Sequence, residues 1–133
     1  MQQPTILFAH GAGAGASHPW MVAWTARLAS LGAVHCFNYP YVEAGRKLPD
    51  RLPRLIEAHR EELARLRKLH EGPLVLVGKS MGSRVGCHLA VEEADVQAVV
   101  CLGYPLVSRS GKVRDKILRQ LRCPTLFVQG SRD

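Results

Sequence analysis

The sequence predicts an α/β fold built on one parallel sheet, and three observations support this prediction. Short apolar runs rich in β-branched residues alternate along the chain with longer segments whose apolar residues recur at helical spacing. Glycine and proline separate these segments, and no repeat, low-complexity tract or linker interrupts them. The apolar runs are nearly continuous, which is typical of strands that helices cover on both faces of a sheet.

Five apolar runs are expected to be strands, at residues 5–10, 34–39, 74–78, 96–104 and 124–130. After the first run and its glycine-rich continuation, Ser17 is expected to cap a helix that has Pro19 in its first turn and ends at Gly32. The length of 133 residues and the hydrophobic fraction of 47% suit a single domain over residues 1–133.

Three further helices follow from apolar spacing. The longest begins near Asp50 and ends before Gly72 and Pro73. A second is expected over 81–92, and a short third one around 113–121. In a parallel sheet of this kind, functional residues gather in the loops at the carboxyl ends of the strands.

The net charge of +7 raises the question of an acidic partner. The positive charge concentrates in residues 46–70 and 109–122, but neither segment interleaves the aromatic residues that stack on bases. Both segments also read as amphipathic helices with a basic, solvated face. We therefore expect no nucleic-acid partner.

Composition also bears on location and on metal binding. No apolar run approaches the roughly 18 residues that cross a bilayer, and the N-terminus lacks the features of a signal peptide. The sequence therefore predicts a cytoplasmic protein with no membrane partner. The four cysteines stand far apart with no C-x-x-C pair, so we expect reduced, mostly buried thiols and neither a metal site nor an organic cofactor.

The stretch LVLVGKSMGSR places Gly78, Ser80 and Gly82 where the third strand turns into a helix. A serine in such a sharp turn is held in a strained conformation, and small neighbours let the two backbones approach. The first turn of a helix offers free N–H groups to a developing negative charge. This arrangement predicts Ser80 as a nucleophile, with the Met81 N–H as the first oxyanion donor.

The loop HGAGAG, residues 10–15, is expected to supply the second donor from the neighbouring strand. The N–H of Ala12, or less favourably that of Gly13, would point at the same place. Two alternative roles for this loop are a tight strand-to-helix connection and a phosphate-binding loop like those of dinucleotide-binding proteins. The dinucleotide alternative is weak because the third glycine is misplaced and Asn38 stands where an acidic ribose ligand is wanted.

Four stretches in order, LFAHGAGAG, GKSMGSR, VVCLGYPL and PTLFVQGSRD, resemble the α/β-hydrolase family that includes testis-expressed protein 30 and bacterial predicted hydrolases of the dienelactone-hydrolase kind. The resemblance covers the whole chain and implies the α/β-hydrolase fold. It implies that the protein hydrolyses a carboxylic ester or a related acyl compound. The substrate would be a small molecule, and the reaction would need no cofactor. The resemblance also implies Ser80 as nucleophile, Asp133 as the acid of a triad, and a loop with His10 and Gly11 that supports the oxyanion site.

The family pattern is incomplete here, because its triad runs Ser, Asp, His and no histidine follows Asp133. His88 lies about 12 Å along the helix from Ser80, and His10 is expected to be structural. Two interpretations remain. The chain could be a fragment that lacks the last strand and helix, with little or no turnover and a tendency to self-associate through its exposed last strand. Alternatively, it could be a non-catalytic binding or scaffold protein.

Several neighbours of Ser80 are open to more than one interpretation. Lys79 could line the pocket or reach solvent, and Tyr104 could form a pocket wall or a simple turn. For Arg84 we expect a salt bridge or a packing role on the helix. Trp20 and Trp24 are expected in the core.

Overall fold

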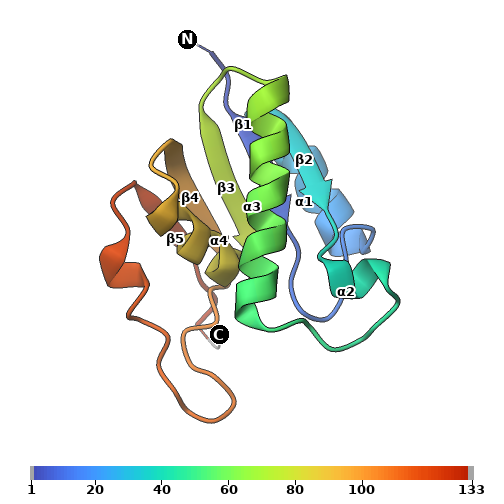
Figure 1. The fold of residues 1–133 in the computed structure, drawn as a ribbon, viewed down its shortest axis with the longest axis vertical. Coiled ribbons are helices and arrows are strands. Elements are labelled where there is room, and N and C mark those ends of the chain that lie inside the picture. Colours follow the sequence, from blue (N-terminus) through green and yellow to red (C-terminus); the bar gives the residue numbers. More distant parts are fainter. Residues whose placement is uncertain (1, 132–133) are drawn as a thin grey trace.

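The computed structural model describes residues 2–131 and confirms the five-stranded parallel α/β fold (Figure 1). The strands lie in the order β2-β1-β3-β4-β5, and every neighbouring pair is parallel. Their bounds are β1 Thr5–Ala9, β2 Ala33–Phe37, β3 Leu74–Lys79, β4 Val96–Leu102 and β5 Thr125–Val128. β1 and β3 are therefore neighbours, so the loops after them meet at one edge of the sheet.

Helices cover both faces of the sheet. α3 (Leu52–Leu69) and α4 (Met81–Glu92) pack on one face, while α1 (Pro19–Leu28) packs on the other, and α2 (Pro40–Glu43) is one short turn after β2 (Figure 1). β1 shows the division: Leu7 and Ala9 join the core under α3 and α4, and Ile6 and Phe8 join the core under α1. This alternation follows from the two-residue period of a strand.

The last strand is the exception to the buried pattern. Leu126, Phe127 and Val128 of β5 are all exposed. β5 pairs with β4 on one side, and no second strand lies on its other side among the described residues. The exposed strand predicted from the sequence is therefore present, and self-association through it stays a prediction.

Two local expectations were wrong. The helix expected around 113–121 is only a 3₁₀ turn at Leu118–Gln120, because Val107 and Val113 form an antiparallel bridge that holds the start of this segment extended. The cap of α1 is His18 instead of Ser17: the His18 Nδ1 accepts the N–H of Trp20 at 3.1 Å. Pro19 begins this helix, so Ser17 stands one position too early.

The four cysteines are free thiols in the structure; Cys87 and Cys101 are buried, and the other two are half-buried. Within residues 2–131, none of the helices has both the length and the apolar character that crossing a membrane requires.

A buried histidine predicts how stability depends on pH. His59 of α3 is 1% exposed, its Nδ1 lies 3.0 Å from the Tyr39 hydroxyl, and its Nε2 has no partner among the described residues. Burial, followed by the nearby His10, lowers the pKa of His59 to about 3. Between roughly pH 6.5 and 3, His59 therefore binds a proton in the unfolded chain but not in the folded chain. This residue alone lowers the free energy of unfolding by about 1.4 kcal/mol per pH unit as the pH drops.

Urea unfolding at pH 7, 6 and 5 measures this dependence. The double variant Tyr39→Phe, His59→Phe removes the titrating group together with its buried partner, and its free energy of unfolding should fall less steeply below pH 6.5. An unchanged slope in that variant would show that His59 does not resist protonation.

Candidate active site

Ser80 stands between β3 and α4 in a strained backbone conformation, with φ 50° and ψ −116°. Among the described residues it is the only one other than glycine with a positive φ. Its hydroxyl makes no hydrogen bond within residues 2–131, and the residue lines two grooves on the surface. A non-glycine residue held at such an angle costs about 1–3 kcal/mol, and such strain is concentrated at active sites.

Gly78 and Gly82 make this turn possible, as the sequence predicted. A Cβ on Gly78 would collide with the backbone N of Ser83, and a Cβ on Gly82 would lie 2.6 Å from the carbonyl oxygen of Ala9. Real Cβ atoms do not approach backbone this closely. Because Gly78 and Gly82 lack a Cβ, α4 can pack closely against β1 and β3. This packing places Ser80 beside the loop that follows β1.

The first turn of α4 leaves two amides free. The carbonyl oxygen of Ser80 accepts the N–H groups of Ser83 and Arg84 at 2.9 and 3.2 Å, together with the Ser83 hydroxyl. Within residues 2–131, the N–H groups of Met81 and Gly82 have no partner. The Met81 N–H is adjacent to Ser80 and at the positive end of the helix dipole, which suits an oxyanion.

The loop after β1 reaches the same place. A Cβ on Gly11 would lie 3.5 Å from the Cβ of Ser80, and Ala12 lines a groove together with Ser80 and Met81. The Gly11 carbonyl oxygen accepts the His10 ring N–H at 2.7 Å, and the Ala12 carbonyl oxygen accepts the Tyr41 hydroxyl at 3.1 Å.

These two bonds determine how the loop presents its amides. In a trans peptide the N–H points opposite to the preceding carbonyl. Because the carbonyls of Gly11 and Ala12 turn towards buried side chains, the N–H groups of Ala12 and Gly13 turn away from the core. Ala12 faces the groove, whereas a Cβ on Gly13 would meet nothing within 4 Å. This geometry fits Ala12 better than Gly13 as the second oxyanion donor.

Tyr41 is a positioning residue that sequence reasoning missed. It lies in α2 and is 1% exposed, and burial raises the pKa of its hydroxyl, so it stays a donor. The motif PYVE carries no signal for this role, because only the fold brings α2 beneath the loop after β1.

His10 has the structural role expected of it. Its ring is fully buried, its Nδ1 donates to the Gly11 carbonyl oxygen, and its Nε2 accepts the Tyr39 N–H at 3.1 Å. Both ring nitrogens are therefore occupied, and burial lowers the pKa of His10. None of the six histidines of the chain makes a hydrogen bond to Ser80. The predicted triad acid, Asp133, lies outside the described residues.

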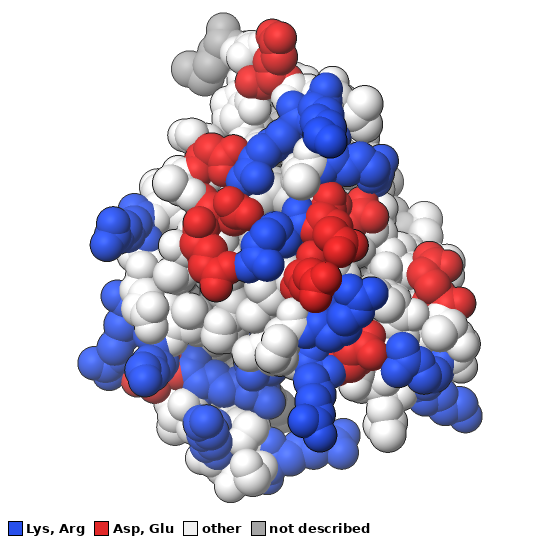
Figure 2. Space-filling model, in the orientation of Figure 1, with Lys and Arg blue, Asp and Glu red and all other residues white. Residues whose placement is uncertain are grey.

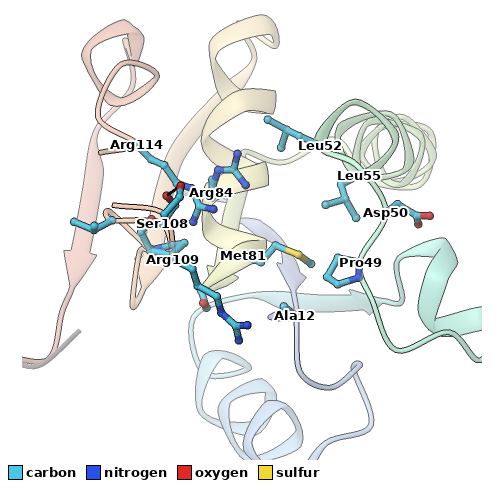
Figure 3. Close-up of a pocket in the computed structure, with 14 residues that line it drawn as sticks. Ala12, Pro49, Asp50, Leu52, Leu55, Met81, Arg84, Ser108, Arg109 and Arg114 are labelled. Atoms are coloured by element: carbon cyan, nitrogen blue, oxygen red, sulfur yellow. Dashed lines mark hydrogen bonds between the residues drawn. The ribbon is translucent and has the colours of Figure 1, made fainter. Parts of the chain in front are cut away.

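Two grooves meet at Ser80. One, of about 650 Å³, is lined by Ser80, Met81 and Ala12 together with Arg84, Arg109 and Arg114 (Figure 3); we call it the arginine groove. The other, of about 630 Å³, is lined by Ser80, Lys79, Tyr104, Trp20 and Trp24; we call it the tryptophan groove. An acyl compound bound at Ser80 could extend into both.

Four side chains singled out from the sequence line the tryptophan groove. Trp20 and Trp24 are half-buried: they pack against the core under α1, as expected, and they also line this groove. The Lys79 ammonium lies 5.1 Å from the ring centroid of Trp20, which holds the side chain along the groove by a cation–π contact. Tyr104 is buried and its hydroxyl donates to the Arg114 carbonyl oxygen at 2.8 Å, so it is part of the wall.

Arg84 does not make the expected salt bridge. Within residues 2–131, no carboxylate lies within ion-pair distance of its guanidinium. Desolvation, followed by the nearby charge of Arg114, lowers the pKa of Arg84. The side chain is half-buried and lines the arginine groove instead.

Solved structures share this fold at low sequence identity. A YdeN-like hydrolase from Pectobacterium atrosepticum is 19% identical, with a TM-score of 0.59 over 94% of this chain and 62% of that one. The ydeN gene product of Bacillus subtilis is 14% identical, with a TM-score of 0.59 over 97% of this chain and 86% of that one. The RedJ thioesterase of Streptomyces coelicolor is 21% identical, with a TM-score of 0.57 over 75% of this chain and 38% of that one.

This chain therefore spans less than two thirds of the first and third of these structures. Residues 2–133 match the family described as "Alpha/beta hydrolase domain". A narrower kinship with testis-expressed protein 30 stays a prediction. On the strength of the match over nearly its whole length, together with the parallel sheet and the strained turn at Ser80, the chain belongs to the alpha/beta hydrolase domain family.

Proposed function

We propose that this protein hydrolyses carboxylic esters or related acyl compounds, thioesters among them, through a covalent intermediate on Ser80. The observation that supports this most strongly is the strained Ser80 with a free hydroxyl between two grooves. The hydroxyl oxygen attacks the acyl carbon and its proton passes to a general base. The alcohol or thiol leaves with a proton, and water then releases the acid and restores Ser80.

The N–H groups of Met81 and Ala12 stabilise the oxyanion in this proposal. The free Met81 amide and the outward turn of the Ala12 amide support these roles. In this proposal the general base is a histidine other than His10, and Asp133 orients it. This assignment follows the family order of the triad and the engagement of both His10 nitrogens.

The test is covalent labelling with a fluorophosphonate probe, which reacts with activated serines. Because no histidine of the chain bonds to Ser80, the probe is added with and without imidazole, which can enter the open groove and act as the base. The proposal predicts slow labelling alone and faster labelling with imidazole, with the adduct on Ser80 in peptide mapping by mass spectrometry.

Ser83 and Ser108 are internal controls in the same chain. Ser83 is buried one turn along α4, and Ser108 lines the arginine groove without backbone strain. Labelling spread over these serines, or no adduct on Ser80 in imidazole, would overturn the proposal and favour a non-catalytic binding protein.

A further inference from the structure

The arginine groove has an uneven distribution of charge. Arg84 extends from α4, and Arg109 and Arg114 come from the segment between β4 and β5, so the three guanidinium groups line one wall (Figure 3). On the face drawn in Figure 2, acidic and basic side chains alternate over the upper part, whereas Lys and Arg predominate at the lower end, where this segment lies.

No acidic partner within residues 2–131 balances these arginines. In this part of the chain the Arg114 Nη1 donates only to the Pro105 carbonyl oxygen, at 3.3 Å, and neither Arg84 nor Arg109 has an ion pair. Among the described residues, Asp50 is the one acidic residue in the lining. It lies on the opposite wall, where its carboxylate pairs with Arg46 at 3.1 Å and accepts the Tyr41 N–H (Figure 3).

A half-buried guanidinium without a partner costs free energy, and like charges placed together add to that cost. Desolvation, followed by the nearby charge of Arg114, lowers the pKa of Arg84. Arginine side chains do not deprotonate in proteins, so a wall of arginines is a lasting positive surface. Their N–H donors match the oxygens of carboxylate and phosphate groups.

We propose that the arginine groove binds an anionic oxygen group, carboxylate or phosphate, on the substrate that Ser80 attacks. This inference rests on the proposed function, since it places the anion within the same substrate. The reacting carbonyl then lies at Ser80, the anionic end lies against the arginines, and the apolar part extends into the tryptophan groove beside Trp20 and Trp24.

Binding is measured without chemistry on the Ser80→Ala chain, by titration of its ¹⁵N-labelled amides in NMR. The probes are succinanilic acid and butyranilide, stable amides that differ in the terminal carboxylate. We expect the acid to bind about tenfold more tightly at low salt, because it gains charge-assisted hydrogen bonds. Added salt should reduce this difference. A third probe with a phosphonate in place of the carboxylate shows which anion the groove prefers.

Arg84→Gln and Arg109→Gln, each in the Ser80→Ala chain, should remove most of the preference for the acid. Arg109 is exposed, so its replacement keeps the fold. Arg119→Gln is the matched control: it removes the same charge from the same segment, but Arg119 pairs with Asp115 and does not line the groove. Equal binding of all three probes, or an equal loss in Arg119→Gln, would overturn the inference.

The two proposals fail in different ways. If Ser80 is not labelled but the chain still binds succinanilic acid more tightly than butyranilide, the hydrolase proposal is contradicted and the groove is an anion-binding site alone. A labelled Ser80 in a chain with no preference contradicts the anion inference alone.

Discussion

Gly82→Ala is expected to lower the free energy of unfolding by about 1–3 kcal/mol, the range typical of overpacked sites. The new methyl group would lie 2.5 Å from the carbonyl oxygen of His10 and 2.6 Å from that of Ala9. Both atoms are backbone, so relief requires α4 to move away from β1. The same movement would separate the Met81 amide from the loop of Ala12.

Gly86→Ala is the matched control for this prediction. Gly86 lies one turn further along α4, and a Cβ there would meet neighbours at 3.8 and 3.9 Å, which is ordinary contact. Alanine also favours a helix over glycine by about 1 kcal/mol. Thermal unfolding followed by circular dichroism should therefore show a lower Tm for Gly82→Ala and an equal or higher Tm for Gly86→Ala. Equal melting of the two variants would show that α4 is not held against β1 as described.

Ser80→Ala is expected to abolish the protein-dependent hydrolysis of p-nitrophenyl esters that imidazole supports. With the hydroxyl gone, no acyl intermediate can form, and the rate should fall to that of imidazole without protein. Without imidazole, the unsubstituted chain should be slow, because removal of the base from a triad costs several orders of magnitude. The measurement is the initial rate of p-nitrophenol release over a series of imidazole concentrations.

Ser108→Ala should keep the imidazole-dependent rate, because Ser108 lies in the same groove but not in the strained turn. Ser80→Cys should keep an acyl burst, since a thiol is also a nucleophile. Rapid hydrolysis without imidazole would contradict the prediction that no histidine among residues 2–131 serves Ser80 as a base. A rate in Ser80→Ala equal to that of the unsubstituted chain would contradict the nucleophile assignment.

The sheet and the turn at Ser80 were predictable because local patterns determine them. The five strands are continuous apolar runs, and the need for glycine at 78 and 82 follows from a strand that turns directly into a helix. The expected helix 81–92 matches α4. These features depend on neighbours in sequence.

The positions of Tyr41 and Arg84 were not predictable, because contacts between distant segments determine them. Tyr41 reaches the Ala12 carbonyl oxygen across 29 positions. Arg84 was expected to make a salt bridge or to pack on its helix, yet the segment near it brings the like charge of Arg114. The helix expected around 113–121 failed for a similar reason, since the Val107–Val113 bridge overrides helical spacing.

A crystal structure of the fluorophosphonate adduct would show directly whether Ser80 is the nucleophile and which amides hold the oxyanion. We expect phosphorus bonded to the Ser80 oxygen, with one phosphonyl oxygen about 2.7–3.1 Å from the N–H groups of both Met81 and Ala12. A phosphonyl oxygen that approaches neither amide, or phosphorus bonded to a different residue, would contradict these assignments.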